Sequence, residues 1–188
     1  MSAHDLYVIS PYLGVAGTAL LVILLDLVVT KKGLLPIFAI LGLLAPLALT
    51  LIQAFDLDDS LNLVKGSELL ANGDPSILLG SLSVDRFALF FNFLVLAAAG
   101  LVIMASTDYL RQMDRYQGEY YGLILFSATG MMLLSAATEL ITIYIAVELT
   151  TMPLVALAAF MNSAKSREAG MKFFIVGAIS SALMLYGM

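Results

Sequence analysis

The sequence predicts an all-α protein, a polytopic bundle of six helices that cross a membrane. Of its 188 residues, 61% are hydrophobic and only 12% are charged, whereas soluble domains contain about 45–50% apolar and 25% charged residues. The apolar residues gather in six runs, each close to the roughly 20 residues that an α-helix needs to cross a bilayer. Most lysines and arginines follow the first, third and fifth runs, so a chain that crosses back and forth places them on one side of the membrane. We therefore treat residues 1–188 as one membrane domain.

The first two predicted spans cover residues 11–30 and 34–55. Lys31 and Lys32 end the first span. The N-terminus has neither the basic leader nor the small-residue cleavage pattern of a signal peptide, so we expect the first span to be retained. Pro46 lies inside the second span, and we expect a kink there because proline lacks the N–H that a helix interior needs.

An acidic loop at residues 56–84 separates the second span from the third. Its acidic residues are Asp56, Asp58, Asp59, Glu68 and Asp74. Gly-Asp-Pro at residues 73–75 is a turn signal. The alternating apolar residues at 77–82 predict a short strand or hairpin. The third span follows at residues 87–106.

The last three predicted spans cover residues 120–137, 140–160 and 168–188. Tyr120 and Tyr121 stand at the start of the fourth span, as in the aromatic belt of a membrane interface. The sixth run has no polar flank at its end. We therefore expect the chain to be a fragment of a longer polytopic protein.

The basic residues predict the orientation of the bundle. In a six-span alternation, six of them fall on one side (Lys31, Lys32, Arg111, Arg115, Lys165 and Arg167) and two on the other (Lys65 and Arg86). The positive-inside rule then places the N-terminus and the acidic loop outside the cell. We expect a multi-pass protein of the bacterial inner (plasma) membrane.

Composition excludes several kinds of site. The chain has no cysteine and a single histidine, His4, so neither a thiolate metal site nor a histidine metal cluster is expected. It has no Gly-rich phosphate loop and no nucleophile elbow. It also has no basic patch, which excludes nucleic acid as a partner. The expected surroundings are the lipid bilayer and other membrane proteins.

Glu148 is the main candidate for chemistry. It lies near the centre of the apolar run 140–160, roughly 12 Å from either end at 1.5 Å per residue. An ionisable side chain at that depth is costly and is a functional candidate by default. The structural alternative is a neutral carboxylic acid that is hydrogen-bonded to Tyr144 or Thr151 on the same helix face. We favour a proton site, buried against protein, because Gln or Ser could fill a structural role at less cost.

Pro153 supports this interpretation of Glu148. Proline removes an amide donor and so frees the carbonyl of Leu149. A free carbonyl beside a carboxyl group can hold a water molecule, and water can carry a proton. An ordinary kink that serves packing explains the proline alone equally well.

Lys172 is the single lysine within a predicted span. We expect Ser166 to cap the sixth helix and Glu168 to lie in its first turn. Lys172 then lies about 9 Å inside the helix. It could tune Glu148 and relay protons along one hydrated path, or it could extend to the interface or pair with Glu168. Asp26 is a weaker candidate, which an interfacial ion pair with nearby lysines also explains.

These residues resemble the antiporter-like membrane subunits of respiratory complex I, the NADH–quinone oxidoreductase, and in the sixth helix the subunit N branch of that family. The resemblance rests on Glu148-Leu149 with Pro153-Leu154 in the fifth helix; on Glu168-Ala169, Lys172-Phe173-Phe174, Gly177, Ser180-Ser181 and Tyr186-Gly187 in the sixth; on Tyr120-Tyr121, Leu125-Phe126 and Gly130-Met131-Met132 in the fourth; on Asp85-Arg86-Phe87-Ala88 with Phe90-Phe91 in the third; and on Leu24-Leu25-Asp26-Leu27 in the first.

The resemblance implies the N-terminal part of a fold with about fourteen spans and two inverted five-helix repeats. Such a subunit moves protons while quinone is reduced elsewhere. It implies that Glu148 is the family's fifth-helix glutamate and that Lys172 matches a lysine of the sixth helix. It also implies that this chain holds no cofactor, because NADH, FMN, the iron–sulfur clusters and quinone belong to partner subunits. The family's lysine on a broken seventh helix lies beyond this sequence.

Two other functions remain open. A multisubunit sodium/proton antiporter shares the motif of Glu148 and Pro153, so that motif does not discriminate between the two. A membrane scaffold that assists assembly is the non-catalytic alternative. It predicts that Glu148 can be replaced by Gln without loss of function.

Overall fold

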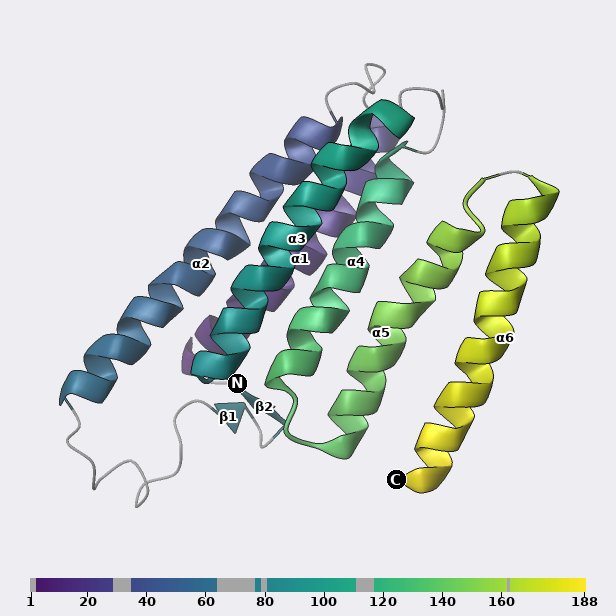
Figure 1. Cartoon of the computed structure of the whole chain (residues 1–188). Coiled ribbons are helices and arrows are strands. Elements are labelled where there is room, and N and C mark those ends of the chain that lie inside the picture. The colour runs from purple at the N-terminus through teal and green to yellow at the C-terminus, as the bar shows by residue number, and fades with distance from the viewer. Residues whose placement is uncertain (1–2, 29–34, 64–76, 79–80, 111–116, 162) are drawn as a thin grey trace.

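The structure is a computed structural model, and it describes residues 3–28, 35–63, 77–78, 81–110, 117–161 and 163–188. Within these ranges the chain forms six long helices and one small hairpin (Figure 1). The helices are α1 (Ala3–Val28), α2 (Leu35–Leu63), α3 (Arg86–Leu110), α4 (Gln117–Ala136), α5 (Leu140–Ala158) and α6 (Ala164–Gly187). The predicted all-α bundle of membrane helices is confirmed.

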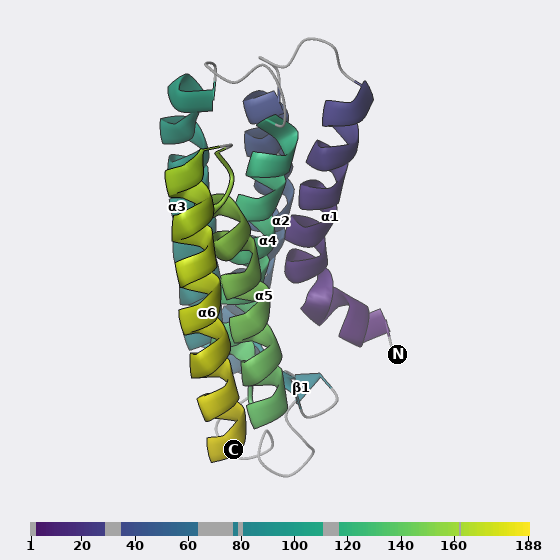
Figure 2. The same cartoon turned by 90° about the vertical axis from the view of Figure 1, so that its right-hand side faces the viewer.

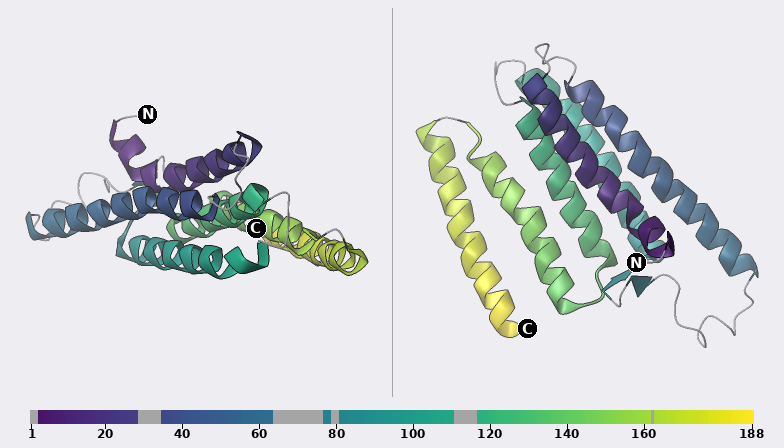
Figure 3. Two further views of the ribbon diagram at one scale, coloured as in Figure 1. Left: turned by 90° about the horizontal axis from the view of Figure 1, so that it is seen from above. Right: turned by 180° about the vertical axis from the view of Figure 1, so that it is seen from behind.

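The helices alternate in direction, so successive helices end at opposite ends of the bundle (Figure 1). Helices α1 to α4 pack together, α5 lies against α4, and α6 packs mainly against α5. The views from above and from behind show α5 and α6 extending from one side of this four-helix group (Figure 3). One side of α5 and most of α6 are therefore uncovered in this chain.

Five of the helices are long and apolar enough to cross a membrane, and α4 is not among them. Helix α4 is the centre of the bundle and contacts α1, α3 and α5. A helix that is surrounded by protein can carry small and polar residues that lipid would penalise, and α4 buries Ser127, Thr129 and Gly130. These buried residues suit its central position.

Helices α1 and α2 extend furthest past their predicted spans. Helix α1 begins at Ala3, about two turns before the predicted start, and Pro11 lies inside it. Figure 2 shows a bend in this first part of α1. Helix α2 continues to Leu63, into the predicted acidic loop. The rest of that loop, residues 64–76, lies outside the described residues.

The kink expected at Pro46 is not apparent, since α2 shows no bend like that of α1 (Figures 1 and 3). Helix α1 packs directly against this turn. A Cβ atom built on Gly14 would lie 3.3 Å from the Cβ of Pro46. Such close contact along the helix leaves little room for a bend toward α1.

The predicted hairpin is confirmed. Strand β1 (Ile77–Leu78) pairs antiparallel with β2 (Leu82–Ser83), with Leu78 opposite Leu82. The amide of Thr138 donates to the carbonyl of Ser81 at 3.0 Å. The hairpin therefore holds the connection between α4 and α5.

A buried polar network joins three helices of the bundle. The Asn92 side chain on α3 donates to the Tyr12 hydroxyl on α1 at 3.1 Å, and the Ser135 hydroxyl on α4 lies 3.3 Å from the Asn92 carbonyl oxygen. Asn92 is fully buried. Because unpaired polar groups are costly in an apolar interior, this network favours one register of α1, α3 and α4.

Candidate functional site

Glu148 lies in the middle of α5, as the sequence predicts. It is eight residues from the start of the helix at Leu140 and ten from its end at Ala158, or about 12 and 15 Å at 1.5 Å per residue. No basic residue lies on α5, and Glu148 is its one charged residue. This depth and isolation make the carboxylate expensive in lipid.

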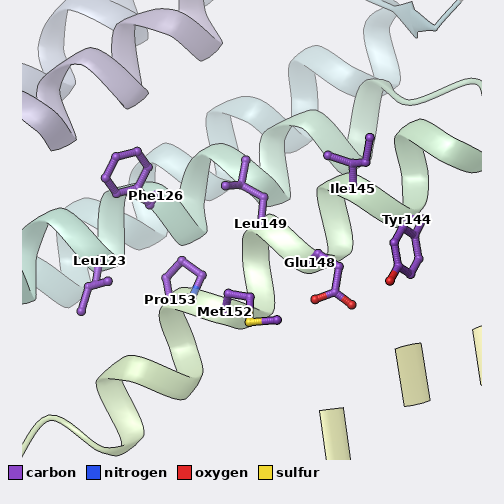
Figure 4. A pocket seen from close by; sticks show the side chains of 8 residues that line it. All are labelled: Leu123, Phe126, Tyr144, Ile145, Glu148, Leu149, Met152 and Pro153. Atoms are coloured by element: carbon purple, nitrogen blue, oxygen red, sulfur yellow. The ribbon is translucent and has the colours of Figure 1, made fainter. Parts of the chain in front are cut away.

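Two open hollows flank the Glu148 side chain. The first, here called the α4–α5 hollow, is lined by Leu123, Phe126, Tyr144, Ile145, Glu148, Leu149, Met152 and Pro153 (Figure 4). The second, the α5–α6 hollow, lies between α5 and residues of α6 that include Phe174, Gly177 and Ser181. The second has a volume of about 340 Å³. Since a water molecule takes about 30 Å³ of the liquid, this volume corresponds to several waters. The lining is mostly apolar, and its polar side chains are Tyr144, Glu148, Thr151 and Ser181.

Glu148 is half-buried, so the expected full burial is wrong for this chain. The reason is that α6 covers only one side of α5. The structural alternative also lacks support, because among the described residues no side chain donates a hydrogen bond to the carboxylate. The Thr151 hydroxyl donates to the Val147 carbonyl of its own helix at 3.0 Å. The carboxylate is therefore partly exposed and borders both hollows.

Pro153 lies inside α5 and is buried. Its missing N–H leaves the Leu149 carbonyl without its usual helical donor. The next carbonyl, that of Thr150, accepts a hydrogen bond from the Ser127 hydroxyl of α4 at 3.1 Å. Among the described residues, no side chain donates to the Leu149 carbonyl. A polar backbone atom thus lies one residue from Glu148, as the sequence predicts.

Helices α5 and α6 are close antiparallel neighbours, but Lys172 does not face Glu148. The face of α6 toward α5 includes Phe174, Gly177 and Ser181. At about 100° per residue, Lys172 lies about 180° around the helix from the centre of that face. Its ammonium group pairs with Glu168 at 2.6 Å, and the two side chains are 73% and 63% exposed.

The depth of Lys172 also differs from the expectation. Ser163, not Ser166, caps α6 and accepts a hydrogen bond from the Ser166 amide. Ser166 instead donates to the Ala158 carbonyl at 2.8 Å and so ties the end of α5 to α6. The helix begins earlier than predicted, and Glu168 lies beyond its first turn. Gly170 lies level with Ala159 at the end of α5, since a Cβ atom built on Gly170 would lie 2.5 Å from the Cβ of Ala159. Lys172 is two residues from that level and Glu148 is eleven, so their depths differ by roughly 13 Å at 1.5 Å per residue, more than the expected 9 Å.

Asp26 lies near the C-terminal end of α1, beside the start of α4. A Cβ atom built on Gly118 of α4 would contact the Asp26 side chain and would lie 3.0 Å from its carboxyl carbon. Gly118 is the second residue of α4, and a carboxylate is favoured at a helix N-terminus. Lys31 and Lys32, its expected partners, lie outside the described residues.

No group of three or more His, Cys, Asp or Glu side chains within the described ranges could hold a metal ion. The sequence did not predict two features of the site: the hydrogen bond from the Ser127 hydroxyl to α5, and the close contact of Gly130 with α5. Small residues on a central helix have many uses, so the sequence alone carries no signal that singles these two out.

The family described as "NADH:quinone oxidoreductase/Mrp antiporter, TM" matches residues 137–188. This stretch contains α5 and α6, with Glu148, Pro153 and Lys172. The fold and this match define the class, which is that of antiporter-like, multi-pass membrane proteins.

Similar proteins identify the branch of this class. NADH-quinone oxidoreductase subunit N of Trichlorobacter lovleyi is 47% identical over 109 residues, which cover 57% of this chain and 22% of the relative. Subunit N of Dehalococcoides mccartyi is 34% identical over 173 residues, which cover 91% of this chain and 32% of the relative. The chain is thus similar to the subunit N branch of the antiporter-like family, which confirms the resemblance.

A solved structure agrees. A chain of the respiratory complex I from Thermus thermophilus with bound aureothin matches with a TM-score of 0.68 and 26% identity. The match covers 94% of this chain and 35% of that one. The chain therefore spans between 22% and 35% of the length of these three similar proteins.

Proposed function

We propose that this chain is part of a proton-translocating membrane subunit of NADH-quinone oxidoreductase, in which Glu148 takes up and releases a proton during quinone reduction. The observation that carries the proposal is the position of Glu148. It is a lone carboxylate at mid-depth on a membrane helix, flanked by hollows that can hold water. The similarity to subunits N supports the same conclusion.

The proposed mechanism is electrostatic. Redox chemistry occurs in partner subunits, which carry NADH, FMN, the iron–sulfur clusters and quinone, and coupling reaches this chain as a change in nearby charge. An opposite charge favours the ionised form of a carboxylate, and a drier environment favours the protonated form. A shift in either can therefore load or unload a proton at Glu148, and water in the α5–α6 hollow can carry it away.

Lys172 is proposed as a second proton group. Its place on the outer face of α6 means that it does not share the α5–α6 hollow with Glu148. It would instead serve a path on the far side of α6, nearer the α5–α6 connection than Glu148. Charged residues in membrane helices usually face protein or water, so we expect other parts of the subunit or complex to cover this face. Asp26 is retained as a weak candidate only.

The proposed location is the bacterial inner membrane, with the N-terminus outside. Helix ends at residues 28, 110 and 158 then lie on the cytoplasmic side, together with the basic connections. Cysteines placed singly at positions 65 and 165 test this in intact cells with a membrane-impermeant thiol reagent. We expect labelling at position 65 and protection at 165, and the reverse pattern would contradict the orientation.

The main test replaces Glu148 by Gln in the assembled complex. Reconstituted vesicles report protons pumped per electron transferred to quinone, and we expect this ratio to fall strongly. Glu139→Gln is the matched control. Glu139 is the residue immediately before α5, away from mid-depth, and its side chain makes no capping hydrogen bond. Normal pumping by Glu148→Gln would contradict the proposal and would favour the scaffold alternative.

The family description also names the Mrp antiporter, so a sodium/proton antiporter remains the second candidate. The two differ in their energy source. A redox-driven pump builds a proton gradient only when NADH and quinone are supplied, whereas an antiporter exchanges ions across vesicles without them. Sodium-driven proton movement without electron transfer would favour the antiporter.

A further inference from the structure

Helix α4 lies very close to α5 at the turn that Pro153 opens. A Cβ atom built on Gly130 would lie 2.5 Å from the Thr150 hydroxyl oxygen and 2.6 Å from the Thr150 amide nitrogen. It would also lie 2.9 Å from the carbonyl carbon of Leu149. Real Cβ atoms essentially never come within 3.0 Å of such neighbours. Glycine is therefore required for the two backbones to touch here.

One turn away on α4, Ser127 adds a hydrogen bond to the same turn of α5. Its hydroxyl donates to the Thr150 carbonyl at 3.1 Å, and its side chain is only 2% exposed. The Thr150 hydroxyl donates to the Ala146 carbonyl at 2.8 Å, so it also has a fixed direction. Contact and hydrogen bond together fix both the distance and the rotation of this turn.

The rotation of this turn decides where Glu148 points. Figure 4 shows Leu149 directed toward α4, while the carboxylate of Glu148 points away from α4. Successive helical residues differ by about 100° around the axis. Holding residues 149 and 150 against α4 thus turns Glu148 toward α6, where it lines the α5–α6 hollow.

We propose that Gly130 and Ser127 are positioning residues for Glu148: they hold the proline-opened turn of α5 against α4 and so direct the carboxylate into the α5–α6 hollow. This inference rests on the proposed function of Glu148. It assigns a role to two residues that neither bind the proton nor line the hollow.

The test compares matched alanine variants in the assembled, reconstituted complex. Gly130→Ala is expected to push α5 away from α4 and to lose most of the protons pumped per electron, while quinone reduction continues. Gly100→Ala on α3 is the control, because a Cβ atom there meets nothing within 4 Å. Ser127→Ala is expected to cause a smaller loss. Its control is Ser106→Ala, since the Ser106 hydroxyl donates only within its own helix, to Ile103 at 3.0 Å.

A second readout separates positioning from a loss of stability. Isotope-edited infrared spectroscopy of the Glu148 side chain reports its hydrogen bonding. We expect its carboxyl band to shift in Gly130→Ala and Ser127→Ala, and not in the two controls. If the assembled variants pump normally with an unshifted band and only the yield of complex falls, the residues serve packing alone and the inference is overturned.

The outcomes distinguish this inference from the function on which it rests. Normal pumping by Glu148→Gln would remove the function itself. Loss of pumping in Glu148→Gln, together with normal pumping in both Ser127→Ala and Gly130→Ala, would overturn only the positioning role. If Gly130→Ala does not assemble, Ser127→Ala decides, because it removes one hydroxyl and adds no atoms.

Discussion

Helices α1 and α5 each contain a proline. They differ in which of the carbonyls freed by the proline accepts a hydrogen bond from a side chain of the neighbouring helix. In α1, the carbonyls four and three residues before Pro11 are those of Tyr7 and Val8. The Gln53 amide of α2 donates to the first at 2.7 Å and lies 3.5 Å from the second. In α5, Ser127 reaches the carbonyl three residues before Pro153. Among the described residues, no side chain donates to the one four residues before it.

Burial and charge follow the same division. Gln53 is neutral and 4% exposed, and the turn at Pro11 packs inside the bundle. Glu148 is an acid, is half-buried and borders two hollows. A proline in a membrane helix is therefore not in itself a sign of function. What matters is whether a neighbouring side chain satisfies the freed carbonyl or leaves it to water.

The largest expected effect on stability is at the Pro11 turn of α1, where Gln53 donates to a freed carbonyl. Gln53→Leu removes one of two side-chain donors to the Tyr7 carbonyl, which keeps the Ser10 hydroxyl at 2.7 Å. The loss of one intramolecular hydrogen bond costs about 0.5–1.5 kcal/mol. We expect lower thermal stability of the complex and unchanged pumping per electron. Thr50→Val, one turn earlier on α2, is the control, because the Thr50 hydroxyl donates only within its helix, to Pro46 at 2.8 Å. Equal destabilisation by both variants would contradict this assignment.

A smaller effect, on function, is expected at the Pro153 turn of α5, where no side chain among the described residues donates to the Leu149 carbonyl. Pro153→Ala restores an amide that can donate to the Leu149 carbonyl, so a water beside Glu148 loses one of its partners. We expect a partial loss of pumping per electron in reconstituted vesicles, with normal assembly. Pro11→Ala should leave pumping unchanged, because the Tyr7 carbonyl already accepts hydrogen bonds from Gln53 and Ser10 and the restored amide displaces no water there. The comparison fails if the two variants pump alike.

The smallest expected effect is at Lys172. Because this lysine lies on the far face of α6 from the α5–α6 hollow, Lys172→Ala should reduce pumping less than Glu148→Gln. Measuring both variants in the same vesicle preparation tests the order. A larger loss in Lys172→Ala would show that the main proton path runs on the outer face of α6.

Much of this architecture could be predicted because lipid imposes length and composition on its helices. The depth of Glu148 and the site of Pro153 follow from counting residues along an apolar run. The facing of Lys172 does not, since pairing with Glu168 and a place in the Glu148 path suit the same spacing. Likewise Ser163 and Ser166 are both plausible caps, and only the packing of α6 on α5 assigns Ser166 to the Ala158 carbonyl.

Contacts between helices set the other limit. Gln53 and Tyr7 are 46 residues apart in sequence, and Ser127 and Thr150 are 23 apart. Neither pair has a spacing rule that would link the two residues. The sequence also did not predict that α4 is central. Its small and polar residues suit a helix surrounded by protein, but in the sequence they only lower the hydropathy of the segment.

The central claim is that Glu148 changes its protonation during turnover. Time-resolved infrared difference spectroscopy of the reconstituted complex, with labelled glutamate and Glu148→Gln as the blank, tests it directly. The account predicts a protonated carboxyl band that appears or disappears when NADH and quinone are supplied and that is missing in the blank. A Glu148 carboxyl that stays in one protonation state throughout turnover would contradict the account.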